Sequence, residues 1–578
     1  MGRLAAHVAA AVTNFSSWKL VALLYGCVQA LALANDEYSI SHDEILAKVR
    51  ALEREVQRIP LLEAEVGRLR DAAAETARRT QDGSSGIEVA INHIWLMRCG
   101  AAVMLMQVGF AMLEAGTCRV KNVQNILLKN LTDVCIGTLT WWAVGWMMAF
   151  GGDNGGSSFA GNGQYFAHGF LSATEDGIYN PSDTNPQVRW VYQWAFCSAS
   201  ATIVSGGVAE RMNFTAYVIF TVCMTGFIYP IVAHWTWSEA GWLAGGSNSS
   251  VTDLGYFDFA GSGVVHMSGG IGALIGAIVV GPRLGRFTAG CEEESFAPHS
   301  LPLIVFGTLI LWYGWYGFNS GSTINIDVGD RSRLAAHVAM NTTIAPAAGG
   351  LTVLFIRLFL LRKYDLSGMC NGILAGLVSI TAACANVHTY SCFAIAVLGG
   401  CIYQCSSMLL RILHIDDPLD AFSIHGACGA WGAIAAVIFD WGKGFDHFNG
   451  RAGFKCIQDG SGRCRDDAWI SALGGQVAGL LCIAAWVTFW SILIFLPLRF
   501  LGILRASEEV EDRGLDKFRH SPATAYVIEH SRNSNNATNA PVKPPQILPT
   551  KFPPGPEQTL APLPNGAPGG VRHPPSLH

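Results

Sequence analysis

Long apolar stretches alternate with short polar ones between residues 90 and 502. A helix crosses a bilayer in about twenty residues, and eleven of these stretches are that long or nearly so. They predict an all-α polytopic membrane protein with eleven transmembrane helices. The stretches are 94–116, 131–150, 189–207, 215–234, 260–281, 301–320, 334–361, 369–387, 391–411, 419–440 and 469–500.

The composition agrees with a membrane protein, and the sequence argues against a nucleic-acid-binding protein and an enzyme. Hydrophobic residues make up 51% of the chain and charged residues 14%, whereas soluble domains carry about 25% charged residues. No basic run is dense enough for nucleic acid. Outside the spans we find no nucleophile–base pair, metal-ligand spacing or phosphate loop. We therefore expect neither an enzyme nor a bound cofactor or metal.

Basic residues recur in the loops on one side of the predicted membrane domain. The positive-inside rule places these loops and the C-terminal tail in the cytosol, and the odd number of spans then places the N-terminus of the core outside a plasma membrane. The loop at 441–468 departs from the rule, with five basic residues beside four aspartates. The basic residues of the inner side are Arg119, Lys121, Arg211, Arg283, Arg286, Arg362, Lys363, Arg411, Arg499 and Arg505.

Two loops carry candidate modification sites. Asn248 opens an Asn-Ser-Ser sequon on the predicted outer side, where a glycan is added in secreted loops. Cys456 and Cys464 share a polar loop and form a candidate disulfide if that loop faces outward. Most other cysteines lie in apolar runs, which is typical of buried free thiols.

The first 89 residues precede the membrane domain. Residues 1–34 have a basic start, a fifteen-residue apolar run and an Ala-Leu-Ala end, which predicts a signal peptide; an uncleaved anchor or a transit segment is the alternative. Residues 35–89 predict an extracellular helix. Its apolar positions follow a heptad with one irregular step at Pro60, which favours an oligomeric coiled coil. The alternative is a solvated amphipathic helix that breaks at Pro60.

The C-terminal region divides into two parts. Residues 503–530 are charged and predict an ordered cytosolic regulatory tail. Residues 531–578 are rich in proline, asparagine and glycine, which predicts disorder.

Two histidines occupy matching places in the two halves of the core. Asp258 precedes His266 by eight residues in the fifth span, and Asp417 precedes His425 by eight in the tenth, each histidine among glycines. Two halves of five helices insert with opposite orientation, so we predict a 5+5 inverted repeat followed by a final helix. The first and sixth spans echo each other in Gly109-Phe110 and Gly317-Phe318.

The spacing suggests a role for these histidines. A helix rises about 1.5 Å per residue, so a carboxylate capping the helix at Asp258 leaves His266 about 12 Å deeper, near the bilayer midplane. If the halves are inverted, His425 reaches a similar depth and the two imidazoles can share a hydrogen bond. Ionisable groups inside a membrane are candidates for conduction. The alternative is a pair of core histidines with satisfied hydrogen bonds.

Several ordered motifs resemble the ammonium transporter, methylammonium permease and Rhesus family. They include the run from Asp258 to Arg283, QVGFAMLEAG, SGGVAERMNF, YGFNSGS and HGACGAWG. The resemblance covers residues 90–530 and fits the ammonium transporter branch. It implies eleven helices per subunit, a homotrimer with one pore in each subunit, and ammonium and methylammonium as substrates.

The resemblance also implies site residues. Trp237, Phe196 and Ser322 match the outer site that recruits the cation, where each aromatic face contributes about 0.5–2 kcal/mol. Phe196 and Phe318 match the stacked pair that closes the pore. Any one of these aromatic residues can equally be a packing residue, and the assignment depends on the ordered match.

Below that gate, His266 and His425 match the twin histidines of the family. Ammonium can lose its proton and pass as neutral ammonia, whereas sodium and potassium would lack oxygen ligands. Asp258 would orient the outer site, and Asp417 would do the same on the inner side. Net charge movement and neutral gas flow both remain open, and so does an ammonium sensor that uses the same pore.

The charged tail matches the family's regulatory segment. Glu511, Gly514 and Asp516 have the E-x-x-G-x-D spacing, and His520 follows. Plant relatives carry a phosphorylated threonine where this chain has Phe518, so that switch is not expected here.

Overall fold

The computed structural model describes seven segments of the chain: residues 42–151, 156–170, 186–244, 254–290, 293–327, 330–440 and 468–526. The predicted signal peptide, the Asn248 sequon, the Cys456–Cys464 pair and the predicted disordered tail at 531–578 lie outside the described residues. For these four, the sequence predictions stand untested.

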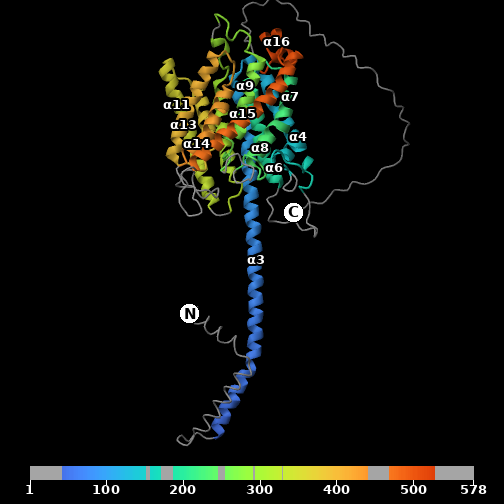
Figure 1. The fold of residues 1–578 in the computed structure, drawn as a ribbon, viewed down its shortest axis with the longest axis vertical. Helices are drawn as coiled ribbons and strands as arrows, with labels where there is room; N and C mark the ends of the chain where they lie inside the picture. Colours follow the sequence, from blue (N-terminus) through green and yellow to red (C-terminus); the bar gives the residue numbers. More distant parts are fainter. Residues whose placement is uncertain are drawn as a thin grey trace, which may run out of the picture. The chain divides into compact units, whose positions relative to one another are not determined.

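The described residues form a bundle of helices (Figure 1). Apart from isolated bridges, such as Met212 with Arg505, no strand occurs among them. The all-α class predicted from the sequence is therefore confirmed. The helices are α3 (His42–Thr117), α4 (Val123–Thr140), α5 (Trp146–Phe150), α6 (Pro186–Gly207), α7 (Phe214–Cys223), α8 (Tyr229–Trp237), α9 (Ser268–Val280), α10 (Leu301–Gly321), α11 (Arg331–Leu361), α12 (Leu366–Thr381), α13 (Thr389–Ile412), α14 (Cys428–Ile438), α15 (Ala468–Phe500), α16 (Glu508–Arg513) and α17 (Leu515–Arg519).

All eleven predicted spans coincide with helical segments. Seven helical segments among the described residues are long and apolar enough to cross a membrane, and two shorter apolar helical segments lie at Leu366–Thr381 and Phe422–Ile438. The predicted spans at 131–150 and 189–207 are helical but are not among these nine. The number of crossings therefore stays a prediction.

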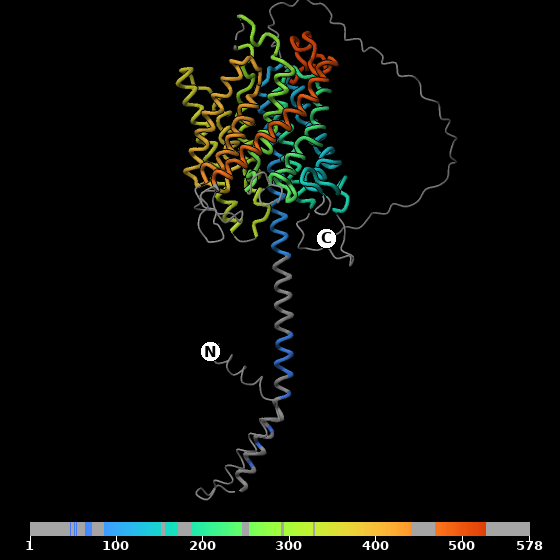
Figure 2. Tube along the Cα trace, viewed as in Figure 1, coloured from blue at the N-terminus to red at the C-terminus, as the bar shows by residue number. Residues whose placement is uncertain are grey.

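Helix α3 is longer than the sequence pattern suggests. It runs for 76 residues and has Pro60 inside it, and its last part enters the bundle (Figure 2). The predicted N-terminal helix and the first predicted span are thus one element. A proline removes one helical hydrogen bond and tends to kink the helix, but it does not end it here.

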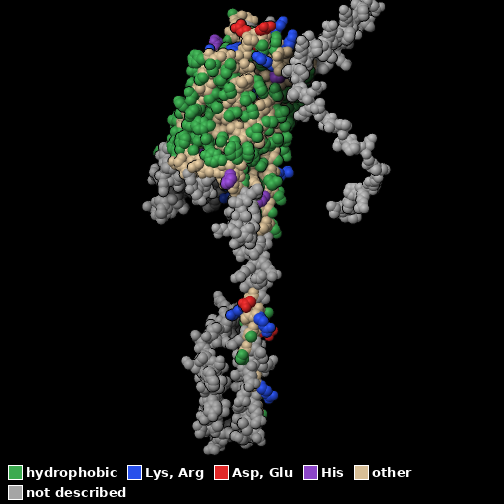
Figure 3. All heavy atoms as spheres, turned by 90° about the vertical axis from the view of Figure 1, so that its right-hand side faces the viewer, with side chains coloured by type: hydrophobic (Ala, Val, Ile, Leu, Met, Phe, Trp, Pro, Cys, Tyr) green, Lys and Arg blue, Asp and Glu red, His purple; other side chains and the backbone are tan. Residues whose placement is uncertain are grey.

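The bundle has a surface suited to lipid. Figure 3 shows hydrophobic side chains covering most of the visible face, with charged side chains gathered at one end. Many large apolar side chains on the outer helices are exposed, for example Phe355 at 60% and Phe359 at 69%. An exposed apolar surface of this extent is typical of a membrane-embedded protein.

Candidate transport pore

The fifth predicted span begins with a carboxylate cap. The side chain of Asp258 accepts hydrogen bonds of 2.8 to 3.0 Å from the four consecutive backbone amides of residues 261–264. These amides begin η5 (Ser262–Met267), a π-helical turn that leads into α9 and carries His266. Free amides at a helix start favour a carboxylate, so Asp258 fixes where the histidine-bearing turn begins.

The tenth predicted span repeats this arrangement. An oxygen of Asp417 accepts a 2.8 Å hydrogen bond from the amide of Phe422. Phe422 begins η7 (Phe422–Ala427), a second π-helical turn, which carries His425 and leads into α14. π-helical turns are rare and occur often at functional sites. The sequence spacing predicts the matching aspartates, but it gives no sign of the π geometry.

The two histidines meet inside the bundle. Their Nδ1 atoms are 3.2 Å apart, a hydrogen bond in which one ring donates and the other accepts according to tautomer. His266 is 0% exposed and His425 4% exposed. The Nε2 atom of His266 is buried and has no hydrogen-bond partner among the described residues. The pair therefore keeps a free polar atom that core histidines normally satisfy.

An aromatic column leads from this pair towards the predicted outer site. The ring of Phe318 lies 5.3 Å from that of His266, and Phe196 stacks on Phe318 at 4.0 Å with an angle of 14° between the rings. Trp237 then contacts Phe196 edge-on at 5.9 Å. The structure thus brings Trp237, Phe196, Phe318 and both histidines into one continuous line of contacts.

Ser322 and Asp258 border the outer part of this column. The Ser322 hydroxyl lies 3.1 Å from the hydroxyl of Tyr192, which also donates to the Phe318 carbonyl at 2.8 Å. The indole nitrogen of Trp237 donates to the Asp258 carbonyl at 2.8 Å. Tyr192 was not singled out by the sequence patterns, because a buried tyrosine in an apolar helix carries no distinctive spacing.

Two further aromatic residues flank the histidines. Trp315 stacks on His266 at 5.0 Å, and Phe110 lies 6.2 Å from His425. Phe110 and Phe318 come from the two echoing Gly-Phe pairs, and each contacts the histidine of a different half. Helices α3 and α10, which carry them, pack closely together. This pairing supports the inverted repeat.

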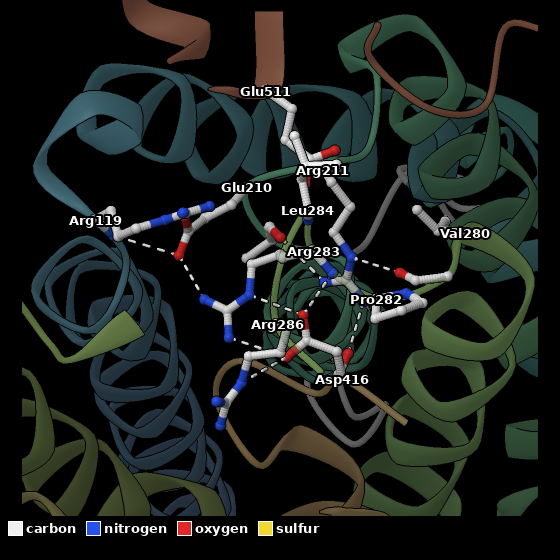
Figure 4. Close-up of polar contacts among 12 residues, drawn as sticks. Arg119, Glu210, Arg211, Val280, Pro282, Arg283, Leu284, Arg286, Asp416 and Glu511 are labelled. Carbon is white, nitrogen blue, oxygen red and sulfur yellow. Dashed lines mark hydrogen bonds and ion pairs between the residues drawn. The ribbon is translucent and has the colours of Figure 1, made fainter. Parts of the chain in front are cut away.

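A charged network joins the loops that carry Glu210, Arg283 and Asp416 (Figure 4). Arg283 forms buried ion pairs with Glu210 at 2.7 Å and with Asp416 at 2.8 Å. Arg119 also pairs with Glu210, and Arg211 donates to the Asp416 carbonyl at 2.6 Å. In the sequence, these arginines are recognisable only as topology signals. Their roles depend on partners far away in sequence.

Electrostatics holds the network in its charged form. Burial acts to raise the pKa of both Glu210 and Asp416, but Arg283, the neighbouring arginines and the hydrogen bonds together exceed this effect, so the pKa of both carboxyls is lowered. Those carboxylates in turn raise the pKa of Arg283. Paired charges of this kind can be buried because the attraction between them and their hydrogen bonds offset the hydration that each charge loses on leaving water.

The tail docks on the same region. Glu511 accepts a 2.6 Å hydrogen bond from the amide of Leu284 and pairs with Arg505 at 2.7 Å. Asp516 accepts from the amides of Gln124 and Asn125, at 2.9 and 2.8 Å, where α4 begins. The tail motif found in the sequence therefore contacts two separate loops of the bundle.

Gly514 is the close-contact point of the tail. It has a φ of 99°, and a Cβ built there would lie 2.6 Å from both the Cβ and the carbonyl oxygen of Lys121. Only glycine adopts this conformation freely and also fits this space.

A second set of buried ionisable side chains, not predicted from the sequence, lies in and beside the first two predicted spans. Asp133 accepts from Tyr217 and from Thr221, the latter at 2.9 Å, and Glu114 accepts from Ser205 at 2.8 Å. Lys129, fully buried, lies 5.0 Å from the centre of the Tyr217 ring. Lys129 and Asp133 share one face of α4, a spacing that was visible in the sequence. No cluster of metal-binding side chains occurs in the part of the chain that the structure describes.

Comparison with known proteins identifies the family. The model of the Ammonium Transporter Family matches residues 94–526, about three quarters of the chain. This chain belongs to the ammonium transporter family. Membership makes it a multi-pass membrane protein of a family of transporters, as the sequence motifs predicted.

Individual members of the ammonium transporter family align over most of their length. Ammonium transporter 1 member 3 of Solanum lycopersicum is 38% identical over 456 residues, which cover 78% of this chain and 95% of that protein. Ammonium transporter 3 of Dictyostelium discoideum is 35% identical over 460 residues, covering 78% and 99%.

Solved structures of the family have the same fold. A protein described as Sensor Amt Protein matches with a TM-score of 0.62 and 30% identity, covering 74% of this chain and 98% of that one. Candida albicans Mep2 matches with a TM-score of 0.62 and 27% identity, covering 73% and 87%.

Proposed function

We propose that this protein carries ammonium and methylammonium across a membrane through the aromatic and histidine column. The cation binds at the outer end, among Trp237, Phe196 and Ser322. Beyond the stacked pair of Phe196 and Phe318 it gives its proton to the free Nε2 of His266 or back to the outer solution, and ammonia then passes the hydrogen-bonded His266 and His425. The observation that carries the proposal is the unbroken contact from Trp237 to His425.

The outer residues suit a small cation that donates hydrogen bonds. Ring faces attract ammonium by about 0.5–2 kcal/mol each, and the Ser322 hydroxyl offers an acceptor. The four hydrogen bonds that the Asp258 side chain accepts from backbone amides fix its backbone, and the Asp258 carbonyl in turn accepts a hydrogen bond from the Trp237 indole. A sodium or potassium ion would need several oxygen ligands to replace its water, and the described column offers aromatic rings and imidazoles instead.

The histidine pair suits both routes for the released proton. A shared Nδ1 hydrogen bond can relay a proton inward, and the free Nε2 of His266 gives that relay a point of access. Charge then accompanies each ammonia. If the proton returns outward instead, the protein works as a neutral ammonia channel.

The cytosolic end offers a way out. A cavity of about 540 Å³ is lined by Arg286, Asp417 and Asp420, next to the turn that carries His425. We propose that ammonia regains a proton in or beyond this polar cavity. The charged side chains that gather at one end of the bundle support an orientation with that end and the tail in the cytosol. We further propose that the protein is a homotrimer in the plasma membrane, as its family resemblance implies.

A sensor is the second candidate function. The likeness to a structure described as Sensor Amt Protein favours it, because that protein has 30% identity to this chain. A sensor would bind ammonium at the same outer site and pass little or none through.

Electrical recording with growth rescue tests these alternatives. Cells without their own ammonium uptake should grow on low ammonium when they express the chain, and ammonium and methylammonium should carry inward current at constant surface expression. Growth without current would favour neutral ammonia flow. Binding without growth or current, despite surface expression, would favour the sensor and contradict the transporter.

A further inference from the structure

Helix α3 extends well beyond the apolar part that forms the first predicted span. The apolar part of the helix begins at Gly86, so residues 42–85 add 44 residues, about 65 Å at 1.5 Å per residue. We call residues 45–76 of this part the stalk. Two of its apolar side chains, Val66 and Leu69, are 49% and 65% exposed. A lone helix in water is only marginally stable, because most helical stability in proteins comes from packing.

The apolar positions of the stalk form a seam suited to a coiled coil. They are spaced alternately by four and three residues, with one extra step of three at Pro60, so they fall at the a and d positions of two heptad blocks. The a positions are Val49, Val56, Val66 and Ala73; the d positions are Ile45, Leu52, Ile59, Leu62, Leu69 and Thr76.

The charges beside this seam are complementary to a second copy of the same stalk. In a parallel coiled coil, position g of one helix faces position e five residues later on its neighbour. In the first block this pairs Lys48 with Glu53, and in the second block it pairs Glu65 with Arg70. Both pairs have opposite signs. Glu65 and Arg70 are exposed on either side of the Val66–Leu69 seam, and Figure 3 shows charged and hydrophobic side chains side by side on this part of the helix.

The continuity of α3 fixes the direction and register of such a pairing. Every copy of the chain inserts into the membrane with the same orientation, and the stalk continues without a break into the first predicted span. Stalks of neighbouring copies therefore run parallel, with equal residue numbers at equal heights. This is the arrangement in which Glu65 faces Arg70 of the next copy.

We propose that the stalk binds the stalks of other copies of this chain as a parallel, in-register coiled coil. The inference is independent of what the pore carries. It gives the protein an assembly contact outside the membrane domain.

Cysteine cross-linking in membranes holding the full-length protein tests the seam. Leu69→Cys lies at a d position and should form covalent dimers under a mild oxidant, above the background of the native cysteines. Asp71→Cys, an exposed f position two residues away, should stay at background. Because subunits that associate only through the membrane domain would bring both positions together by chance, equal cross-linking of the two variants, or none, would overturn the proposal.

Charge reversal then tests the register, with Leu69→Cys cross-linking as the readout. Glu65→Arg places two arginines opposite each other and should lower the cross-linking yield several-fold, as should Arg70→Glu. The double reversal restores opposite charges and should restore the yield. A double variant no better than the single ones would exclude the proposed register. Transport measured on the same samples reports separately on the proposed function.

Discussion

The aromatic column and the charged network use burial in opposite ways. In the column, two imidazoles hydrogen-bond each other at 3.2 Å and are otherwise surrounded mainly by rings. In the network, Arg283 contacts two carboxylates, and those carboxylates contact further arginines. A strong fixed charge in the column would hold or repel a passing cation. The network, by contrast, gains rigidity from every charge that it pairs.

The two regions meet at neighbouring residues. Asp416 belongs to the network, where it binds Arg283, and Asp417 caps the turn that carries His425. The loop that the network holds is thus the one that begins the second histidine turn. A displacement of the network should therefore shift the position of the histidine pair, whereas a change in a histidine side chain should leave the network intact.

The largest effect is expected from Arg283→Met. The variant leaves Glu210 and Asp416 buried without their main partner, which typically costs about 3–5 kcal/mol. We expect little folded protein in the membrane, measured as the amount that survives detergent extraction and size-exclusion chromatography.

Arg333→Met is the matched control. Arg333 pairs with Asp330 at 3.4 Å, but these side chains are 80% and 63% exposed, and such pairs are typically worth about 0–1 kcal/mol. Equal yields of the two variants would show that the network contributes nothing special to stability.

The histidine variants should keep the fold and lose the function. His266→Ala or His425→Ala should abolish selective ammonium current per surface molecule, and the double variant should be no worse than either. Residues that act as one unit lose the whole effect at the first removal. Near-normal yield with unchanged ammonium-over-potassium selectivity in either single variant would contradict the relay.

The sequence predicted the column better than the network, for a physical reason. Local spacing gives the depth of the histidines, because eight residues separate Asp258 from His266, and the ordered match to the family supplied Trp237, Phe196 and Phe318. The network depends on contacts between distant loops, such as Arg283 with Asp416, and no local pattern encodes these. The π-helical turns were missed because they depend on packing rather than on residue preference.

The tail packs against the loop after Arg283 and against the start of α4, so its disruption should reach the column through these elements. Gly514→Asp adds a side chain where the φ is 99° and Lys121 leaves no room, which should undock the tail and stop transport without preventing insertion. Gly502→Asp is the control, because its φ is also positive, at 71°, but nothing lies within 4 Å of a Cβ there. Full current in the Gly514 variant would show that the tail is not coupled to the pore.

The smallest effect is expected from pH, acting on the docked tail through His520. Its Nε2 lies 3.2 Å from the Asn125 side-chain oxygen, and burial, opposed by Asp516 and aided by Arg519, lowers the pKa of His520. The docked tail therefore favours the neutral imidazole. Its contribution is present above the unfolded pKa of about 6.5 and is lost as the pH falls through the lower, folded value.

Acidification from about pH 7.5 to 5.5 should accordingly loosen the tail by a modest factor. Hydrogen exchange of the 507–526 peptide in the full-length protein measures this, with His520→Gln as reference. The glutamine does not titrate, and dividing by its rate at each pH removes the intrinsic pH dependence of amide exchange. We expect the ratio to rise on acidification, whereas the carboxylates of the network, whose pKa values are lowered, stay charged over the same range. A constant ratio would mean that the tail is held by Glu511 and Asp516 alone.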